Sequence, residues 1–70
     1  MKKYAVIPAR YAATRFPGKL MQLLDDKPVI LHVYDNTVAT GLFDEVYVVT
    51  DSDIIFNAAA AHGARVIKSL

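Results

Sequence analysis

Short apolar runs alternate along the chain with stretches whose apolar residues recur at helical spacing. Residues 3–7 form a brief apolar run that ends at Pro8, and residues 46–50 form a second, almost continuous β-branched run. A third run of this kind begins over residues 65–68. Runs without alternation are typical of parallel strands that are covered on both faces. The pattern therefore predicts three buried strands.

Two helices are predicted between these strands. Pro28 occupies a position suited to the first turn of a helix, which we expect to run to about Thr40 before Gly41 ends it. Apolar positions repeat along this helix and predict a stripe that packs onto a sheet. These positions are Val29, Val33 and Thr37, beside Ile30, Tyr34 and Val38.

The second helix carries the alanine run of residues 58–61 and is expected to stop at Gly63. Asp51 or Ser52 can cap its start. The order strand, helix, strand, helix, strand, with short connections, predicts right-handed crossovers and a parallel three-layer α/β unit. This is the first βαβαβ part of a Rossmann-like, doubly wound fold in one domain, and its unpaired sheet edge suggests a piece of a longer protein.

Composition narrows the class of protein. Seventy residues with 54% hydrophobic and 21% charged content predict a folded segment, and the absence of cysteine excludes disulfides and thiolate metal sites. The apolar runs are shorter than the roughly 20 residues that span a bilayer. A net charge of +1 gives no indication of nucleic-acid or membrane binding. The absence of cysteine is compatible with a reducing compartment, so a cytoplasmic location is expected.

The loop over residues 9–19 concentrates positive charge. Arg10, Arg15 and Lys19 stand there without an acidic residue among them. In parallel sheets ligands bind at the carboxyl ends of the strands, where this loop begins, and a polyphosphate needs such cations to offset its charge. Charge and placement alone leave two interpretations open, an anion site and a solvated surface. A Walker loop is excluded because Leu20 follows Lys19.

Residues 7–19, IPARYAATRFPGK, closely resemble the opening of the 3-deoxy-manno-octulosonate cytidylyltransferases, the CMP-KDO synthetases. The resemblance continues at the helix start, residues 27–30, in the helix body, residues 32–34, and in the second strand, residues 48–51. It covers essentially the whole chain. Residues 1–70 would then form the N-terminal nucleotide-binding portion of a longer nucleotidyltransferase domain.

The resemblance implies transfer of a cytidylyl group from CTP to the sugar acid KDO, with release of pyrophosphate, for lipopolysaccharide biosynthesis. It also implies a magnesium cofactor (Mg2+) with ligands beyond Leu70, so this segment alone is not expected to catalyse transfer, and a homodimeric enzyme with CTP and KDO as its partners. The residues implied to bind CTP are Pro8, Ala9, Arg10, Ala13, Arg15 and Lys19. Arg15 and Lys19 would also be catalytic, since they would stabilise charge on the leaving pyrophosphate.

Three departures from the family pattern stand out. Ala13 replaces a common serine, so that only its backbone amide can face a phosphate, and Leu20-Met21 replaces Pro-Leu. Asp26 replaces a usual glycine, which is compatible with a turn. The related sialic-acid cytidylyltransferases typically continue with a glycine-rich segment, unlike residues 11–19 of this chain. This difference favours KDO as the acceptor.

Other polar residues are interpreted as structural. Asp51 either faces the site or caps the following helix, and the capping role is favoured. His32 and His62 have no partner at metal-ligand spacing. Two further functions remain open: a non-catalytic nucleotide-binding fragment, and a related nucleotidyltransferase that activates another sugar.

Overall fold

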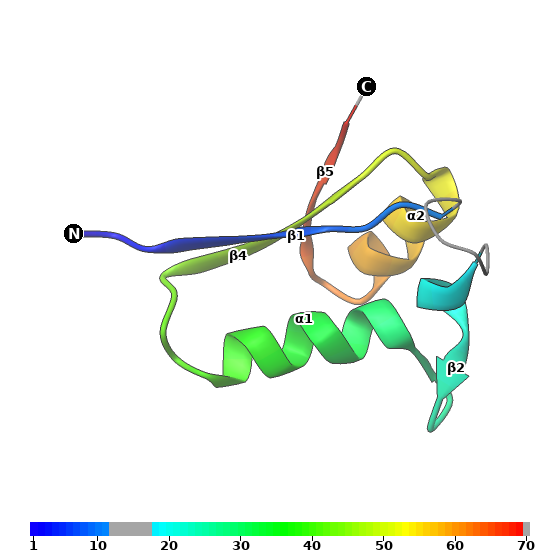
Figure 1. The fold of residues 1–70 in the computed structure, drawn as a ribbon, viewed down its shortest axis with the longest axis horizontal. Coiled ribbons are helices and arrows are strands. Elements are labelled where there is room, and N and C mark those ends of the chain that lie inside the picture. The colour runs from blue at the N-terminus through cyan, green and yellow to red at the C-terminus, as the bar shows by residue number, and fades with distance from the viewer. Residues whose placement is uncertain (12–17, 70) are drawn as a thin grey trace.

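A computed structural model describes residues 1–11 and 18–69 of the chain (Figure 1). The three predicted strands and two predicted helices are all present, with bounds within a residue or two of those expected. In chain order the elements are β1 (Tyr4–Pro8), η1 (Lys19–Met21), β2 (Leu23–Leu24), β3 (Lys27–Pro28), α1 (Val29–Ala39), β4 (Glu45–Thr50), α2 (Asp53–Ala61) and β5 (Arg65–Lys68).

The main sheet has the order β1-β4-β5, with both pairs parallel. Val48 of β4 lies between Ile7 of β1 and Val66 of β5. Because all three strands run the same way, their carboxyl ends meet at one edge of the sheet. The predicted α/β class and the Rossmann-like βαβαβ order are thus confirmed.

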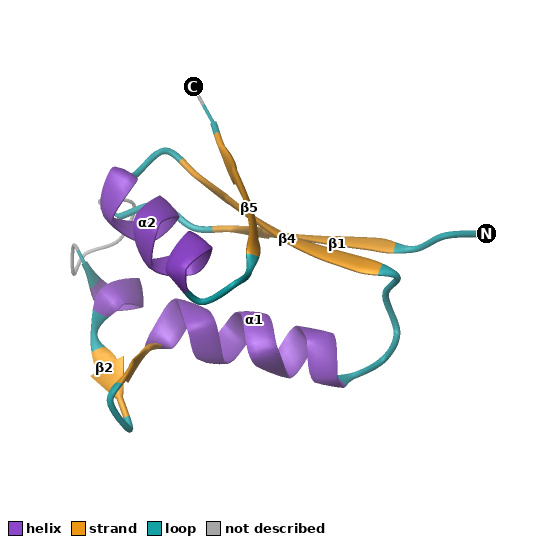
Figure 2. Ribbon diagram, turned by 180° about the vertical axis from the view of Figure 1, so that it is seen from behind, coloured by secondary structure: helices purple, strands orange, loops and turns teal. Residues whose placement is uncertain are grey.

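Both long helices cover the same face of this sheet (Figure 2). Ile30 of α1 and Ile55 of α2 join one buried cluster with Val48 of β4. Right-handed crossovers between successive neighbouring strands place their helices on one side. The described residues therefore form two layers, and the three-layer prediction is wrong for them.

The opposite face of the sheet is open. Tyr4, Val6 and Ile67 alternate with core-facing residues and are 54%, 59% and 49% exposed. On this face the Tyr47 hydroxyl donates to Glu45 Oε2 at 2.9 Å, and this hydrogen bond is the main reason that the pKa of Tyr47 is raised. Strand β4 is thus buried on one face only, because no second layer covers the other.

Helix α1 buries only part of the predicted stripe, together with Leu31, which was not expected in it. Ile30 and Leu31 are its buried residues, and Tyr34 packs at the edge of the core. Val33 and Val38, which were expected in the stripe, are exposed. With so many apolar residues around the helix, its orientation against β4 decided which of them became buried.

A small hairpin, absent from the predicted elements, connects η1 to α1. Strands β2 and β3 pair antiparallel through Leu23 with Pro28 and Leu24 with Lys27. Asp25 and Asp26 form its turn, with φ of 53° and 63°, which agrees with the turn expected at Asp26. Pro28 ends β3 and precedes α1, so its predicted place inside the first helical turn is off by one position.

Candidate functional site

The candidate site lies at the carboxyl edge of the sheet, where the loop leaves β1. Backbone pairing continues past the strand ends: Ala9 N donates to Val49 O and Ser69 N donates to Thr50 O, both at 2.8 Å. Ala9 is fully buried in the core cluster. The chain therefore leaves the sheet at Arg10, from a fixed starting point.

Arg10 faces an acid across the sheet edge. Its Nε lies 3.8 Å from Asp51 Oδ2, and the two side chains are 70% and 47% exposed. An exposed pair of this kind contributes at most about 1 kcal/mol to stability, so a ligand can compete for Arg10. Arg10 thus lies beside the carboxyl end of β4, at the edge where the sequence predicts an anion site.

Asp51 does not cap α2, contrary to the favoured prediction. Ser52 is the N-cap residue, and its Oγ accepts from Ile55 N at 3.3 Å. Ser52 N in turn donates to the buried Thr50 Oγ1 at 3.1 Å. Because Ser52 satisfies the helix start, the Asp51 carboxylate is left to face Arg10.

The two described ends of the loop meet at Tyr11 and Gly18. Gly18 N donates to Tyr11 O at 2.8 Å, and Gly18 then leads into η1 through a hydrogen bond from Met21 N to Gly18 O at 2.9 Å. Arg10 and Lys19 directly flank this closure, and both are exposed. Two of the three predicted cations are therefore attached to opposite sides of one short stem.

The structure describes only some of the remaining predicted site residues. Pro8 is exposed at the end of β1, next to the buried Ala9. Ala13 and Arg15 lie outside the described residues. Within residues 1–11 and 18–69 no enclosed pocket forms. The roles assigned to these residues stay predictions.

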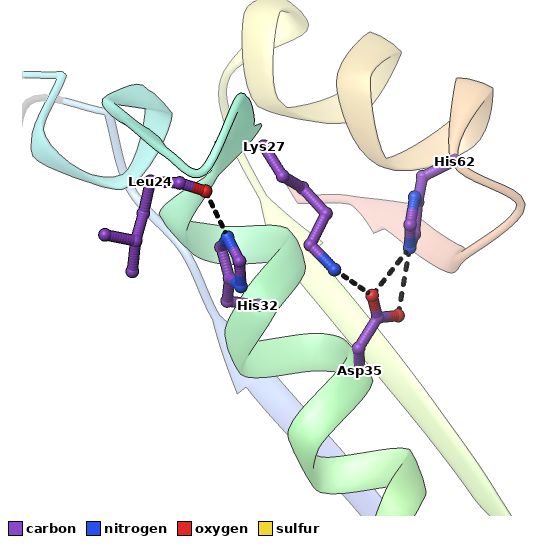
Figure 3. A network of polar contacts seen from close by, with 5 residues as sticks. All are labelled: Leu24, Lys27, His32, Asp35 and His62. Atoms are coloured by element: carbon purple, nitrogen blue, oxygen red, sulfur yellow. Dashed lines mark hydrogen bonds and ion pairs between the residues drawn. The ribbon is translucent and has the colours of Figure 1, made fainter.

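A polar network joins the hairpin to both helices away from this edge (Figure 3). Lys27 Nζ donates to Asp35 Oδ2 at 2.6 Å, and His62 Nε2 lies 2.9 and 3.1 Å from the two oxygens of the same carboxylate. The hydrogen bond from Lys27 and then that from His62 lower the pKa of Asp35 below its ordinary value. Sequence reasoning missed Asp35, since its partners come from β3 and from the end of α2.

The histidines have partners within the chain. His32 Nε2 is 2.6 Å from Leu24 O, which fastens α1 to β2, and His62 contacts Asp35 as described. In the part of the chain that the structure describes, no group of three His, Cys, Asp or Glu side chains is placed to hold a metal ion. No described helix is long and apolar enough to cross a membrane.

Residues 4–69 match the sequence model of the cytidylyltransferase family. The chain belongs to this family. Among curated relatives of this cytidylyltransferase chain, the 3-deoxy-manno-octulosonate cytidylyltransferase of Flavobacterium johnsoniae is 59% identical over 70 residues, which cover 100% of the chain and 29% of the relative. The enzyme of the same name from Geobacter metallireducens is 50% identical over 66 residues, 94% of the chain and 26% of the relative.

A solved structure supports the fold of this cytidylyltransferase chain. It is described as CMP:2-keto-3-deoxy-manno-octonic acid synthetase complexed with CTP, and it superposes with a TM-score of 0.87 at 38% identity. The match covers 96% of the chain and 28% of that structure. The chain thus spans less than a third of the length of the proteins it resembles.

Proposed function

We propose that this chain carries the triphosphate-binding loop of an enzyme that transfers a cytidylyl group from CTP to KDO. The observation that supports the proposal is the hydrogen bond from Gly18 N to Tyr11 O, which closes the stem next to Arg10 and Lys19 where the loop leaves the sheet. Relatives named for this reaction and a related synthetase complexed with CTP support the choice of nucleotide and acceptor.

The proposed reaction makes one bond to phosphorus and breaks another. The anomeric hydroxyl oxygen of KDO attacks the α-phosphorus of CTP, the hydroxyl proton is released, and pyrophosphate leaves with the bridging oxygen. Negative charge grows on the pyrophosphate, where cations stabilise it most. The Arg10 guanidinium can grip two oxygens, and Lys19 acts as a mobile point charge. Arg15 would share this role with Lys19, while Pro8, Ala9 and the Ala13 backbone would adjoin the nucleotide.

The proposed magnesium cofactor would be held by residues of the longer protein, beyond Leu70. This ion is usually held by one or two carboxylates together with substrate phosphates. The described residues offer no cluster of ligands for it, and Asp51 already faces Arg10. These residues therefore do not fit a resident magnesium site. A cytoplasmic homodimer acting in lipopolysaccharide biosynthesis is likewise part of the proposal.

Pyrophosphate release tests the proposed function. The complete gene product, given CTP, magnesium and KDO, should release pyrophosphate, whereas sialic acid in place of KDO, or another nucleotide in place of CTP, should give little. Lys19→Ala should lower the rate about 100-fold, because one stabilising cation of a transition state is commonly worth this much. Absence of release with KDO would refute the proposal.

A second candidate is nucleotide binding without catalysis, because cations at the sheet edge could bind a triphosphate without transferring any group. CTP binding by the complete gene product, without pyrophosphate release from any sugar in the assay, would support this candidate. Release with a sugar other than KDO would identify the third possibility, a nucleotidyltransferase with another acceptor.

A further inference from the structure

Tyr11 and Gly18 contact each other in two independent ways. The first is the backbone hydrogen bond from Gly18 N to Tyr11 O, at 2.8 Å. The second is between the Tyr11 side chain and the bare Cα of Gly18: a β-carbon at Gly18 would lie 3.0 Å from the Tyr11 hydroxyl oxygen and 3.1 Å from Cζ. The Tyr11 ring thus occupies the space that any other residue at position 18 would need.

Gly18 is suited to this place for a second reason. Its φ is +80°, a left-handed conformation that glycine adopts without the steric cost of a side chain. Gly63 has a φ of +86° at the end of α2, but a β-carbon there would meet nothing within 4 Å. Both glycines therefore have a left-handed backbone conformation, but of the two only Gly18 also packs against an aromatic ring.

We propose that Tyr11 is a positioning residue, whose ring packs on Gly18 and fixes the separation of Arg10 and Lys19 for a triphosphate. This inference rests on the proposed function of the loop. Two cations that bind one triphosphate repel each other when the anion is absent, so a stem that fixes the backbone next to both reduces the ordering that binding would otherwise require. Ala9, buried and bonded to Val49 O, fixes the stem on the sheet.

Affinity for inorganic triphosphate, measured with the complete gene product, tests the inference. Tyr11→Ala should weaken it about tenfold, which equals about 1.4 kcal/mol, because the two cations lose their fixed separation. Tyr11→Phe keeps the ring and should restore at least half of the parent affinity. Gly18→Ala should weaken binding similarly. Its matched control, Gly63→Ala, introduces the same left-handed strain without the ring contact and should leave the affinity for triphosphate unchanged.

Cytidine separates positioning from general damage to the fold. It has no phosphates, so Tyr11→Ala should leave its affinity within about twofold of the parent if the residue acts on the cations, a difference below about 0.4 kcal/mol. Equal loss of triphosphate and cytidine binding would overturn the inference, as would a Tyr11→Ala protein that binds triphosphate like the parent. Either result is compatible with pyrophosphate release from KDO and CTP, so the inference can fail while the proposed function stands.

Discussion

At the scale of single residues, the partners of a charged side chain decide what it does. Asp35 lies in the middle of α1, yet it accepts hydrogen bonds from Lys27 of β3 and contacts His62 at the end of α2. Lys27 lies just before α1 in the chain, whereas His62 lies 27 residues beyond Asp35, so one carboxylate fastens the hairpin and both helices together. The side chain is 38% exposed, and solvent therefore limits the energy of these contacts.

Replacing Asp35 should reveal this role through its pH dependence. Asp35→Asn should lower the free energy of unfolding by about 1 kcal/mol at neutral pH, because Lys27 and His62 lose a charged acceptor. The folded pKa of Asp35 lies below its ordinary value of 3.8, so its stabilisation is present above that pH and is lost as the pH falls through the lowered pKa. Urea unfolding should show that the difference in free energy of unfolding between the parent and Asp35→Asn is smaller below pH 3.8 than at pH 7.

Asp53→Asn is the matched control for this prediction. Asp53 pairs with Lys68 and is 78% exposed, so its replacement should cost less than that of Asp35. Equal urea midpoints for the parent and Asp35→Asn at pH 7 would contradict the proposed fastening role.

At the scale of elements, the hairpin from Leu23 to Pro28 contains a turn whose residues can adopt the required backbone conformation but are not the most favourable for it. Its two central residues, Asp25 and Asp26, both have positive φ, as a type I′ turn demands. Aspartate adopts this conformation more readily than most residues, but glycine has no β-carbon to strain there. This geometry explains why position 26 tolerates aspartate and would suit glycine.

Asp26→Gly should therefore stabilise the chain. We expect a gain of about 0.5 kcal/mol, since relief of left-handed strain outweighs the greater freedom that glycine gives the unfolded chain. Thermal unfolding should show a higher midpoint. Ala60→Gly, at an exposed position of α2 with ordinary helical geometry, should instead cost about 1 kcal/mol. A lower midpoint for Asp26→Gly would show that the aspartate side chain itself stabilises the turn.

At the scale of the whole molecule, the sheet has one covered and one open face. Tyr4, Val6 and Ile67 leave an apolar surface on the open side, whereas Val48 and its neighbours are sealed by α1 and α2. Apolar surfaces of this kind favour association with other apolar groups. The open face of the two-layer arrangement should therefore bind apolar molecules in solution.

The chain of 70 residues should bind a hydrophobic fluorescent dye through this open face. The double variant Val6→Thr and Ile67→Thr should reduce dye fluorescence while changing the free energy of unfolding by less than about 0.5 kcal/mol, because both side chains are already half exposed. Ile54→Thr replaces an isoleucine that is 54% exposed on α2 and should leave dye binding unchanged. Equal loss in both variants would mean that the dye does not report on the sheet face.

The sequence by itself determined the order and approximate bounds of the strands and long helices, because apolar periodicity and glycine stops are local signals. Through its basic run it also indicated the loop after β1 and the candidates Arg10 and Lys19. The tertiary structure alone decided that both helices share one face of the sheet and that Leu31 is buried while Val33 is exposed.

Contacts between distant residues likewise required the tertiary structure. Asp51 and Ser52 both suit a helix cap, and only the packed backbone left Asp51 facing Arg10. The contact between the Tyr11 ring and Gly18 depends on closure of the loop, which the spacing of residues along the chain does not predict. Local propensities depend on neighbours along the chain, whereas pairing, burial and closure depend on which segments meet in space.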